Sequence, residues 1–139
     1  MLTIKIICFL NNIENYNFQL SILDGLKKDL TVDKPNDFND CIRWARCLFE
    51  DNFHNTIAQL LHNFPPNQMT TSGAPFWSGP KRCPAPVKFD ADNDEHLDFI
   101  VAAANLRAYN YSLPTNRDRK FIKEWATSLV IPNFSPRSG

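Results

Sequence analysis

The sequence predicts an all-α fold, an irregular bundle of about four helices with a long crossover loop rich in proline, glycine and aromatic residues. Apolar residues recur every third or fourth position in four separate segments, which is the period of an amphipathic helix. Six of the ten prolines and two of the four glycines fall between Pro65 and Pro86, where they exclude a helix or a central strand. The alternation of apolar and charged residues at Val87–Asp90 predicts one short extended piece at most.

The composition is that of one globular domain. Of the 139 residues, 43% are hydrophobic and 12% aromatic, and a chain of this length buries roughly two thirds of the surface that its unfolded form exposes. Fifteen basic residues balance fifteen acidic ones, so the chain has no general attraction to nucleic acid or to an anionic membrane. We therefore expect neither as a partner.

Neither the start of the chain nor its cysteines indicate secretion or membrane insertion. The apolar stretch Leu2–Leu10 is interrupted by Lys5 and is far shorter than the ~20 residues of a membrane span. It also lacks the basic start and small-residue cleavage site of a signal peptide. No disulfide framework is indicated by the spacing of the four cysteines, which are Cys8, Cys41, Cys47 and Cys83. These features predict reduced thiols and a cytoplasmic and nuclear location.

The first two helices are predicted at Phe18–Leu30 and Phe38–Phe64. In the first, apolar residues occupy every fourth position, and Pro35 prevents its continuation. Asn36 or Asp37 is the expected N-cap of the second helix, which has the strongest periodic signal in the chain. This helix would run for about seven turns, and we expect a kink near Asn52 to Thr56.

The crossover from Phe64 to Asn93 is longer than the ~15 residues beyond which structureless loops become uncommon. It contains Phe76 and Trp77, which belong to residue types that are normally buried. We therefore expect a rigid, packed connector that serves a function or docks onto a neighbouring surface.

Two further helices follow the crossover. Asp92, Asn93 or Asp94 is expected to cap the third helix, which Leu113-Pro114 ends. The fourth helix is predicted at Arg117–Leu129, with Thr115 or Asn116 as its cap, and the residues from Pro136 to Gly139 have no element to complete. Small side chains at Ala102–Ala104 permit close helix approach on two faces. The predicted core contains Trp44, Leu48, Phe49, Ile57, Leu61, Ile100, Ala104 and Trp125.

The histidines and two of the cysteines are not arranged for catalysis or metal binding. Cys41 and Cys47 would point to different faces of one helix, about 9 Å apart along its axis, which is beyond disulfide or shared-metal reach. His54 and His62 would lie about 12 Å apart and cannot chelate one ion. His96 falls in the first turn of the third helix, where a solvated or capping role is expected.

Cys83 is the one thiol in a setting that favours reactivity. Lys81 and Arg82 precede it, and nearby cations favour the nucleophilic thiolate. No histidine adjoins it in sequence to act as a base, so we interpret it as an unreactive loop cysteine. The sequence also has no glycine-rich phosphate-binding loop, so this chain alone is not expected to bind a nucleotide.

Three segments of the chain form specific motifs, which read QLLHNFPP at 59–66, SGAPFWSGPKRCP at 72–84 and HLDFIVAAANL at 96–106. Together they closely resemble the second catalytic-cysteine half-domain of the eukaryotic ubiquitin-activating enzyme. The resemblance is continuous from about Ile22 to the last residue. We therefore divide the chain into an N-terminal segment at residues 1–16, which is not assigned to the family, and the helical half-domain at residues 17–139, truncated at both ends.

This resemblance implies a mechanism that is shared with parts of a larger enzyme. An adenylation domain activates the C-terminal carboxylate of ubiquitin with ATP and magnesium, a cysteine of this half-domain takes the acyl group as a thioester, and a conjugating enzyme then receives it. The implied partners are ubiquitin, ubiquitin-conjugating enzymes and the adenylation domain of the parent. ATP and magnesium would be cofactors of the parent and not of this piece.

The sequence departs from the family pattern at the nucleophile. The family's thioester cysteine lies in a Cys-Thr-Leu-Lys-Asn-Phe-Pro segment several tens of residues before the counterpart of Cys41. Cys8 echoes that segment but stands only 33 residues before Cys41 (41 − 8), and the proline is missing. Cys41 and Cys83 match family positions that are not the nucleophile. No residue is therefore assigned as catalytic, cofactor-binding or metal-ligating, and the isolated piece is expected to be inactive.

Two other functions remain open at this stage. The chain could be a free-standing helical interaction module whose crossover docks a partner without chemistry. It could also be a small thiol enzyme that uses Cys83 with one of the three histidines.

Overall fold

The computed structural model describes residues 16–138 and divides the chain into two units, residues 1–35 and 36–139. In the first unit the described part holds one helix, α2 (Tyr16–Leu30), at the predicted place. Lys27 and Lys28 lie in its last turn, where cations favour the helix dipole. Most of its large apolar side chains, Phe18, Leu20, Leu23, Leu26 and Leu30, are exposed.

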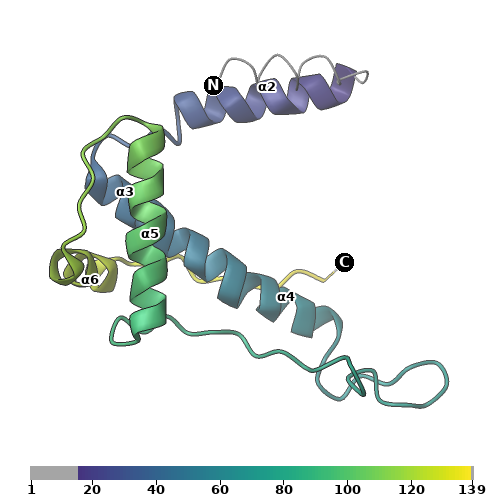
Figure 1. Ribbon diagram of the computed structural model, residues 1–139. Helices are drawn as coiled ribbons and strands as arrows, with labels where there is room; N and C mark the ends of the chain where they lie inside the picture. The colour runs from purple at the N-terminus through teal and green to yellow at the C-terminus, as the bar shows by residue number, and fades with distance from the viewer. Residues whose placement is uncertain (1–15, 139) are drawn as a thin grey trace. The chain divides into compact units, whose positions relative to one another are not determined.

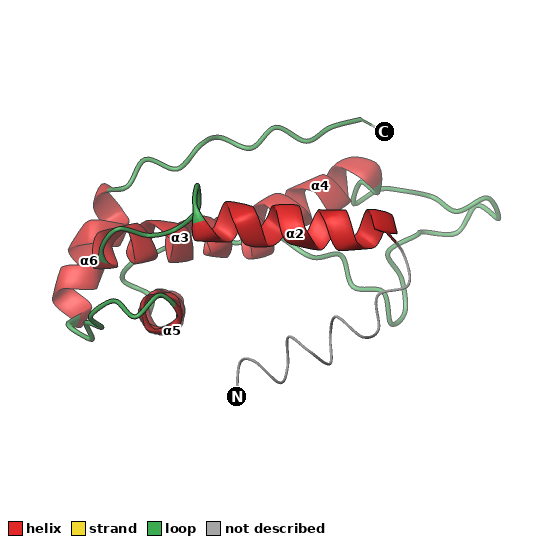
Figure 2. Cartoon of the chain, turned by 90° about the horizontal axis from the view of Figure 1, so that it is seen from above, coloured by secondary structure: helices red, strands yellow, loops and turns green. Residues whose placement is uncertain are grey.

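The second unit is built entirely from helices and loops. It contains α3 (Phe38–Glu50), a π-helical turn η1 (Asp51–Asn55), α4 (Thr56–Asn63), α5 (Asp94–Asn110) and α6 (Arg119–Ser128). Figure 1 shows α3, η1 and α4 as one continuous rod that α5 crosses at the level of α3, and α5 is seen end-on in Figure 2. Within residues 16–138 there is no strand, and the only bridge pairs Met69 with Pro75. The all-α prediction is confirmed.

The rod follows the sequence signals closely. Asp37 caps α3 by accepting a hydrogen bond from the Asp40 amide at 3.0 Å, as expected. A kink was expected near Asn52 to Thr56, and the structure has a π-turn at this place, in which the backbone hydrogen bonds span five residues and not four. Pro65-Pro66 follows the last turn of α4.

The caps of the last two helices are partly as expected. Asn93 caps α5, with its side chain accepting from the amides of Glu95 and His96. The expected cap of α6 is wrong, because Asp118 and not Thr115 or Asn116 accepts from the first free amides, those of Lys120 and Phe121. The side chain and backbone of Asn116 are used instead to shape the loop that precedes α6.

The core lies where α5 and α6 pack on α3. It consists of Cys41, Ile42, Ala45, Phe49, Leu97, Ile100, Ala104, Ala108, Ile122 and Ala126. Ala45 on α3 and Ala104 and Ala108 on α5 all have 0% exposure, and their small side chains let α3 and α5 approach closely. Trp44 and Trp125 pack against this cluster from its edge.

Five of the eight predicted core residues are not in it: Trp44 and Trp125 at its edge, and Leu48, Ile57 and Leu61. Leu48, Ile57 and Leu61 are only half-buried, and α4 has no buried residue. For Ile57 and Leu61 the physical reason is that α5 and α6 pack on α3, whereas α4 continues the rod beyond them. The apolar face that periodicity identified is real, but no helix of this unit covers it along α4.

None of the helices within residues 16–138 is long and apolar enough to cross a bilayer.

Candidate functional site

The three cysteines in the described part of the chain are all free thiols in different surroundings. Cys41 is fully buried, its sulfur lies 3.5 Å from the carbonyl oxygen of Asp37, and burial raises the pKa of its thiol. Cys47 is half-buried and burial likewise raises the pKa of its thiol, with a smaller contribution from Asp51. Neither thiol is in an environment that activates a nucleophile.

Cys83 is exposed on the crossover, and its sulfur lies 3.7 Å from the carbonyl oxygen of Pro84. The neighbouring cation Lys81 lies 4.8 Å from the centre of the Phe76 ring, so its charge is engaged with the aromatic face. Cys8, the remaining cysteine, lies outside the described residues.

The histidines are placed for structure. His96 was expected to be solvated or to cap the helix, and this is wrong in part: its ring packs 4.9 Å from that of Phe49, and its Nδ1 accepts from the Asp90 amide at 3.1 Å. His54 lies 3.6 Å from the Glu50 carboxylate, and His62 lies on α4. Among residues 16–138 no group of three or more His, Cys, Asp and Glu side chains is arranged to hold a metal ion.

The crossover is ordered by its own aromatic side chains. The ring of Phe76 stacks on that of Phe64 with centres 4.9 Å apart, and the Trp77 indole nitrogen donates to the carbonyl oxygens of Phe64 and Pro65 at 3.0 and 3.1 Å. Between them, the Phe76 amide donates to the Gln68 carbonyl at 2.8 Å, which closes a compact loop. Gly73 adopts a φ of 78° at the tip of this loop, a conformation that favours glycine.

The far end of the crossover returns along the rod. The Val87 amide donates to the carbonyl oxygen of Phe53 in the π-turn at 2.8 Å. Phe89 then packs its ring 5.2 Å from that of Phe49, and the Arg46 guanidinium lies 4.2 Å from its centre. The extended piece expected around Val87 and Phe89 is therefore anchored to η1 and α3, and it does not form a strand.

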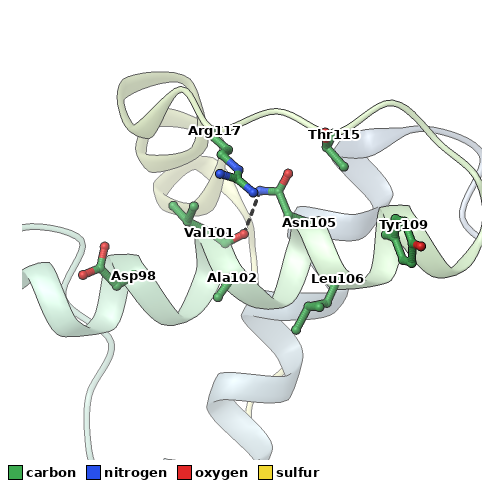
Figure 3. Close-up of a pocket in the computed structure, with 8 residues that line it drawn as sticks. All are labelled: Asp98, Val101, Ala102, Asn105, Leu106, Tyr109, Thr115 and Arg117. Carbon is green, nitrogen blue, oxygen red and sulfur yellow. Dashed lines mark hydrogen bonds between the residues drawn. The ribbon is translucent and has the colours of Figure 1, made fainter.

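An open pocket of about 700 Å³ runs along the outer face of α5. Figure 3 shows its floor, formed by α5 residues from Asp98 to Tyr109, and its wall, formed by Thr115 and Arg117. Asn105 fixes that wall, because its side chain donates to the Asn116 carbonyl at 2.7 Å and accepts from the Asn116 amide at 3.0 Å. This pocket combines apolar side chains of α5 with the charged side chains of Asp98 and Arg117, and its lining offers no arrangement of nucleophile and base.

The chain matches the family model described as "Ubiquitin-activating enzyme, SCCH domain" over residues 7–139. It belongs to this family. Ubiquitin-like modifier-activating enzyme 1 of Dictyostelium discoideum is 50% identical over 124 residues, which cover 89% of this chain and 12% of that protein. The Homo sapiens protein of the same name is 47% identical over 120 residues, covering 86% of this chain and 11% of that protein. Ubiquitin-activating enzyme E1 1 of Schizosaccharomyces pombe is 47% identical over 118 residues, which cover 85% of this chain and 12% of that protein.

The family membership confirms the resemblance inferred from the sequence motifs, and it does not favour the free-standing interaction module. The chain spans about an eighth of the length of these relatives. The family model reaches to residue 7, so part of the N-terminal segment at 1–16 falls within the match, whereas the structure describes that segment only from Tyr16. The boundary at residues 16 and 17 remains a prediction.

Two contacts of the C-terminal residues were not foreseen. Pro136–Gly139 was expected to have no element to complete, and its described part forms no helix or strand. It is nevertheless held by side chains of α4, because the Gln59 side chain pairs with the backbone of Arg137, and the Ser138 hydroxyl lies 3.1 Å from His62 Nε2. Gln59 and Asn105 each bind both backbone groups of one loop residue. Only the polar residue type at a half-buried helix position could have indicated them, since their partners lie far away or in a loop.

Proposed function

We propose that this chain supplies the helical body of the thioester-carrying half-domain of a ubiquitin-activating enzyme. The observation that carries the proposal is the family match over residues 7–139, together with about 50% identity to a ubiquitin-like modifier-activating enzyme. In this reading the parent enzyme adenylates ubiquitin, carries it as a cysteine thioester and passes it to a conjugating enzyme. Ubiquitin, the conjugating enzyme and the parent's adenylation domain are the proposed partners, and the proposed location is cytoplasmic and nuclear.

The reactive sulfur is proposed to lie outside residues 16–138. A thioester nucleophile must be a thiolate that its partners can reach. The buried setting and raised thiol pKa of Cys41, and the raised thiol pKa of Cys47, oppose this role. Cys83 is exposed but is not accompanied by an activating base in the contacts of its sulfur. The chain's contribution is then a rigid body that holds the crossover in place.

ATP and magnesium are proposed to be held by the adenylation domain and not by this chain. The sequence has no glycine-rich phosphate loop, and the acidic side chains of the described residues form no cluster suited to a divalent ion. When bound there, ATP would supply the adenylyl group that activates the C-terminal carboxylate of ubiquitin, with pyrophosphate as the leaving group, and the residues of this chain would act only in positioning the half-domain.

A chimera tests this proposal. In the Dictyostelium discoideum relative, the matching 124 residues are replaced by those of this chain, and ubiquitin thioester formation is followed as an adduct that dithiothreitol removes. We expect the chimera to be charged, and its charging to change by less than about twofold when Cys41, Cys47 and Cys83 are all replaced by Ala. Adenylate formation, measured by ATP–pyrophosphate exchange, is the folding control. Loss of charging on Cys83→Ala with intact exchange would overturn the assignment.

A further inference from the structure

The side-chain amide of Gln59 binds the backbone of Arg137 as a neighbouring strand would. Its Nε2 donates to the Arg137 carbonyl oxygen at 3.0 Å, and its Oε1 accepts from the Arg137 amide at 3.0 Å. Because both bonds go to main-chain groups of a single residue, the contact recognises an extended backbone and is indifferent to the side chain at that position.

Neighbouring residues of the rod hold this amide in position and add a second polar contact. Gln59 Nε2 also lies 3.2 Å from Asn63 Oδ1, one turn further along α4. The neighbouring residue His62 makes the second contact, in which its Nε2 lies 3.1 Å from the Ser138 hydroxyl oxygen. Residues spaced three and four apart share one face of a helix, so Gln59, His62 and Asn63 form a continuous polar edge.

An aromatic residue precedes the paired backbone by three positions. Phe134 forms one wall of a depression of about 380 Å³, and the other lining residues come from the π-turn and the start of α4: Asp51, Asn55, Thr56 and Gln59. It is 38% exposed, whereas Val130, before the contact begins, is 92% exposed. In Figure 1 the yellow C-terminal trace runs beside the rod towards the end of α4, in agreement with these contacts.

We propose that this face of η1 and α4 is a binding site for an extended peptide, and that residues 134–138 occupy it in cis. The peptide that fits this site has an aromatic residue at the position of Phe134. Three positions later, at the position of Arg137, its backbone amide and carbonyl are available for hydrogen bonds, and the next residue carries a hydroxyl, as Ser138 does. Pro136 suits this conformation, because a proline restricts the residue before it to extended backbone. The inference goes beyond the proposed function and does not depend on it.

The occupancy is exchangeable, because the contact is built on exposed groups. None of residues 132–138 is buried, and every hydrogen bond of the contact is exposed to solvent. The tethered segment is favoured by its high effective concentration, so a second peptide of the same kind competes only when it is abundant. The site therefore switches between its own segment and an added one without unfolding of the core.

Nuclear magnetic resonance of the full 139-residue chain tests the proposal. In Gln59→Ala we expect the Arg137 amide signal to move and its exchange with water to become at least threefold faster. Gln68→Ala is the matched control, because Gln68 is, like Gln59, a half-buried glutamine of this unit, and its side chain bonds only the carbonyl of Met69. It should leave the Arg137 signal unchanged.

A synthetic peptide of residues 130–138 is the probe for exchange. Added at millimolar concentration to the labelled chain, it should move the Arg137 signal towards its position in Gln59→Ala, and the same peptide with Phe134→Ala should need at least fivefold more. An unchanged exchange rate of the Arg137 amide in Gln59→Ala would overturn the role of Gln59 in holding the segment. Failure of the native peptide to displace the segment, or equal potency of the two peptides, would overturn the binding site.

Discussion

The Val87 amide donates a hydrogen bond of 2.8 Å to the carbonyl oxygen of Phe53, joining the returning crossover to the π-turn of the rod. A carbonyl oxygen has two lone pairs, and the wider π-turn leaves one of them open to an outside donor. The rings of Phe53 and Phe49 lie 4.9 Å apart and that of Phe53 lies 5.3 Å from Phe99, so the same turn is tied into the aromatic edge of the core. The π-turn is thus where the crossover is fixed to the helices.

Removing the Val87 amide should loosen that attachment. Val87→Pro deletes the donor, and we expect the free energy of unfolding in urea to fall by about 1 kcal/mol, the typical value of one hydrogen bond. Ala85→Pro lies in the same proline-rich run, and its amide makes no hydrogen bond to any described residue, so it should cost less than about 0.5 kcal/mol. Equal losses in the two variants would contradict a specific role for the Phe53 contact.

The close crossing of α3 and α5 depends on small side chains on one face of α5 only. Ala104 is at 0% exposure against α3, so Ala104→Leu should destabilise the fold by about 1–3 kcal/mol through overpacking. Ala102 is exposed on the outer face, and Ala102→Leu should change stability by less than about 0.5 kcal/mol. Thermal unfolding followed by circular dichroism compares them, and similar melting temperatures would refute this packing.

Asn105 holds the loop between α5 and α6 through both backbone groups of Asn116. Asn105→Ala leaves that amide and carbonyl without their partner, which should cost about 2 kcal/mol in urea unfolding. Asn110→Ala removes an exposed asparagine from the last position of the same helix and should be nearly neutral. A neutral effect of Asn105→Ala would show that water replaces the side chain.

The buried thiol of Cys41 makes stability depend on pH in a defined direction. Burial raises the pKa of this thiol above its ordinary value of 9.0, so the unfolded chain loses the proton first as pH rises. The contribution of Cys41 to stability is therefore constant below about pH 8 and falls progressively above pH 9. Urea unfolding at pH 7, 8, 9 and 10 should show a smaller alkaline loss in Cys41→Ala than in the parent chain. Identical pH profiles would contradict burial of this thiol.

Sequence reasoning succeeded where the signal was local. The Asp37 cap and the inward positions Ile100 and Ala104 follow from neighbours within one or two turns, and each is confirmed. Ile57 and Leu61 were misplaced because periodicity identifies an apolar face but does not say which element covers it.

Contacts between residues far apart in the sequence could not be predicted. Gln59 and Arg137 are 78 residues apart, so no local pattern marks their contact. The cap of α6 was assigned wrongly for a related reason: Asn116 and Asp118 are both good cap residues, and the bond between Asn105 and Asn116 decides between them. The crossover shows the same limit. The family motifs predicted which domain it belongs to, but they did not predict that it contacts the π-turn.

The central proposal is that residues 16–138 carry the helical body of the half-domain and not its reactive sulfur. The most direct measurement incubates the purified 139-residue chain with ubiquitin, ATP and magnesium and examines it by intact-protein mass spectrometry before and after dithiothreitol. We expect no ubiquitin adduct on the chain alone, and adduct formation when a complete ubiquitin-activating enzyme is tested in parallel. A dithiothreitol-sensitive ubiquitin adduct on any cysteine of the isolated chain would contradict the account.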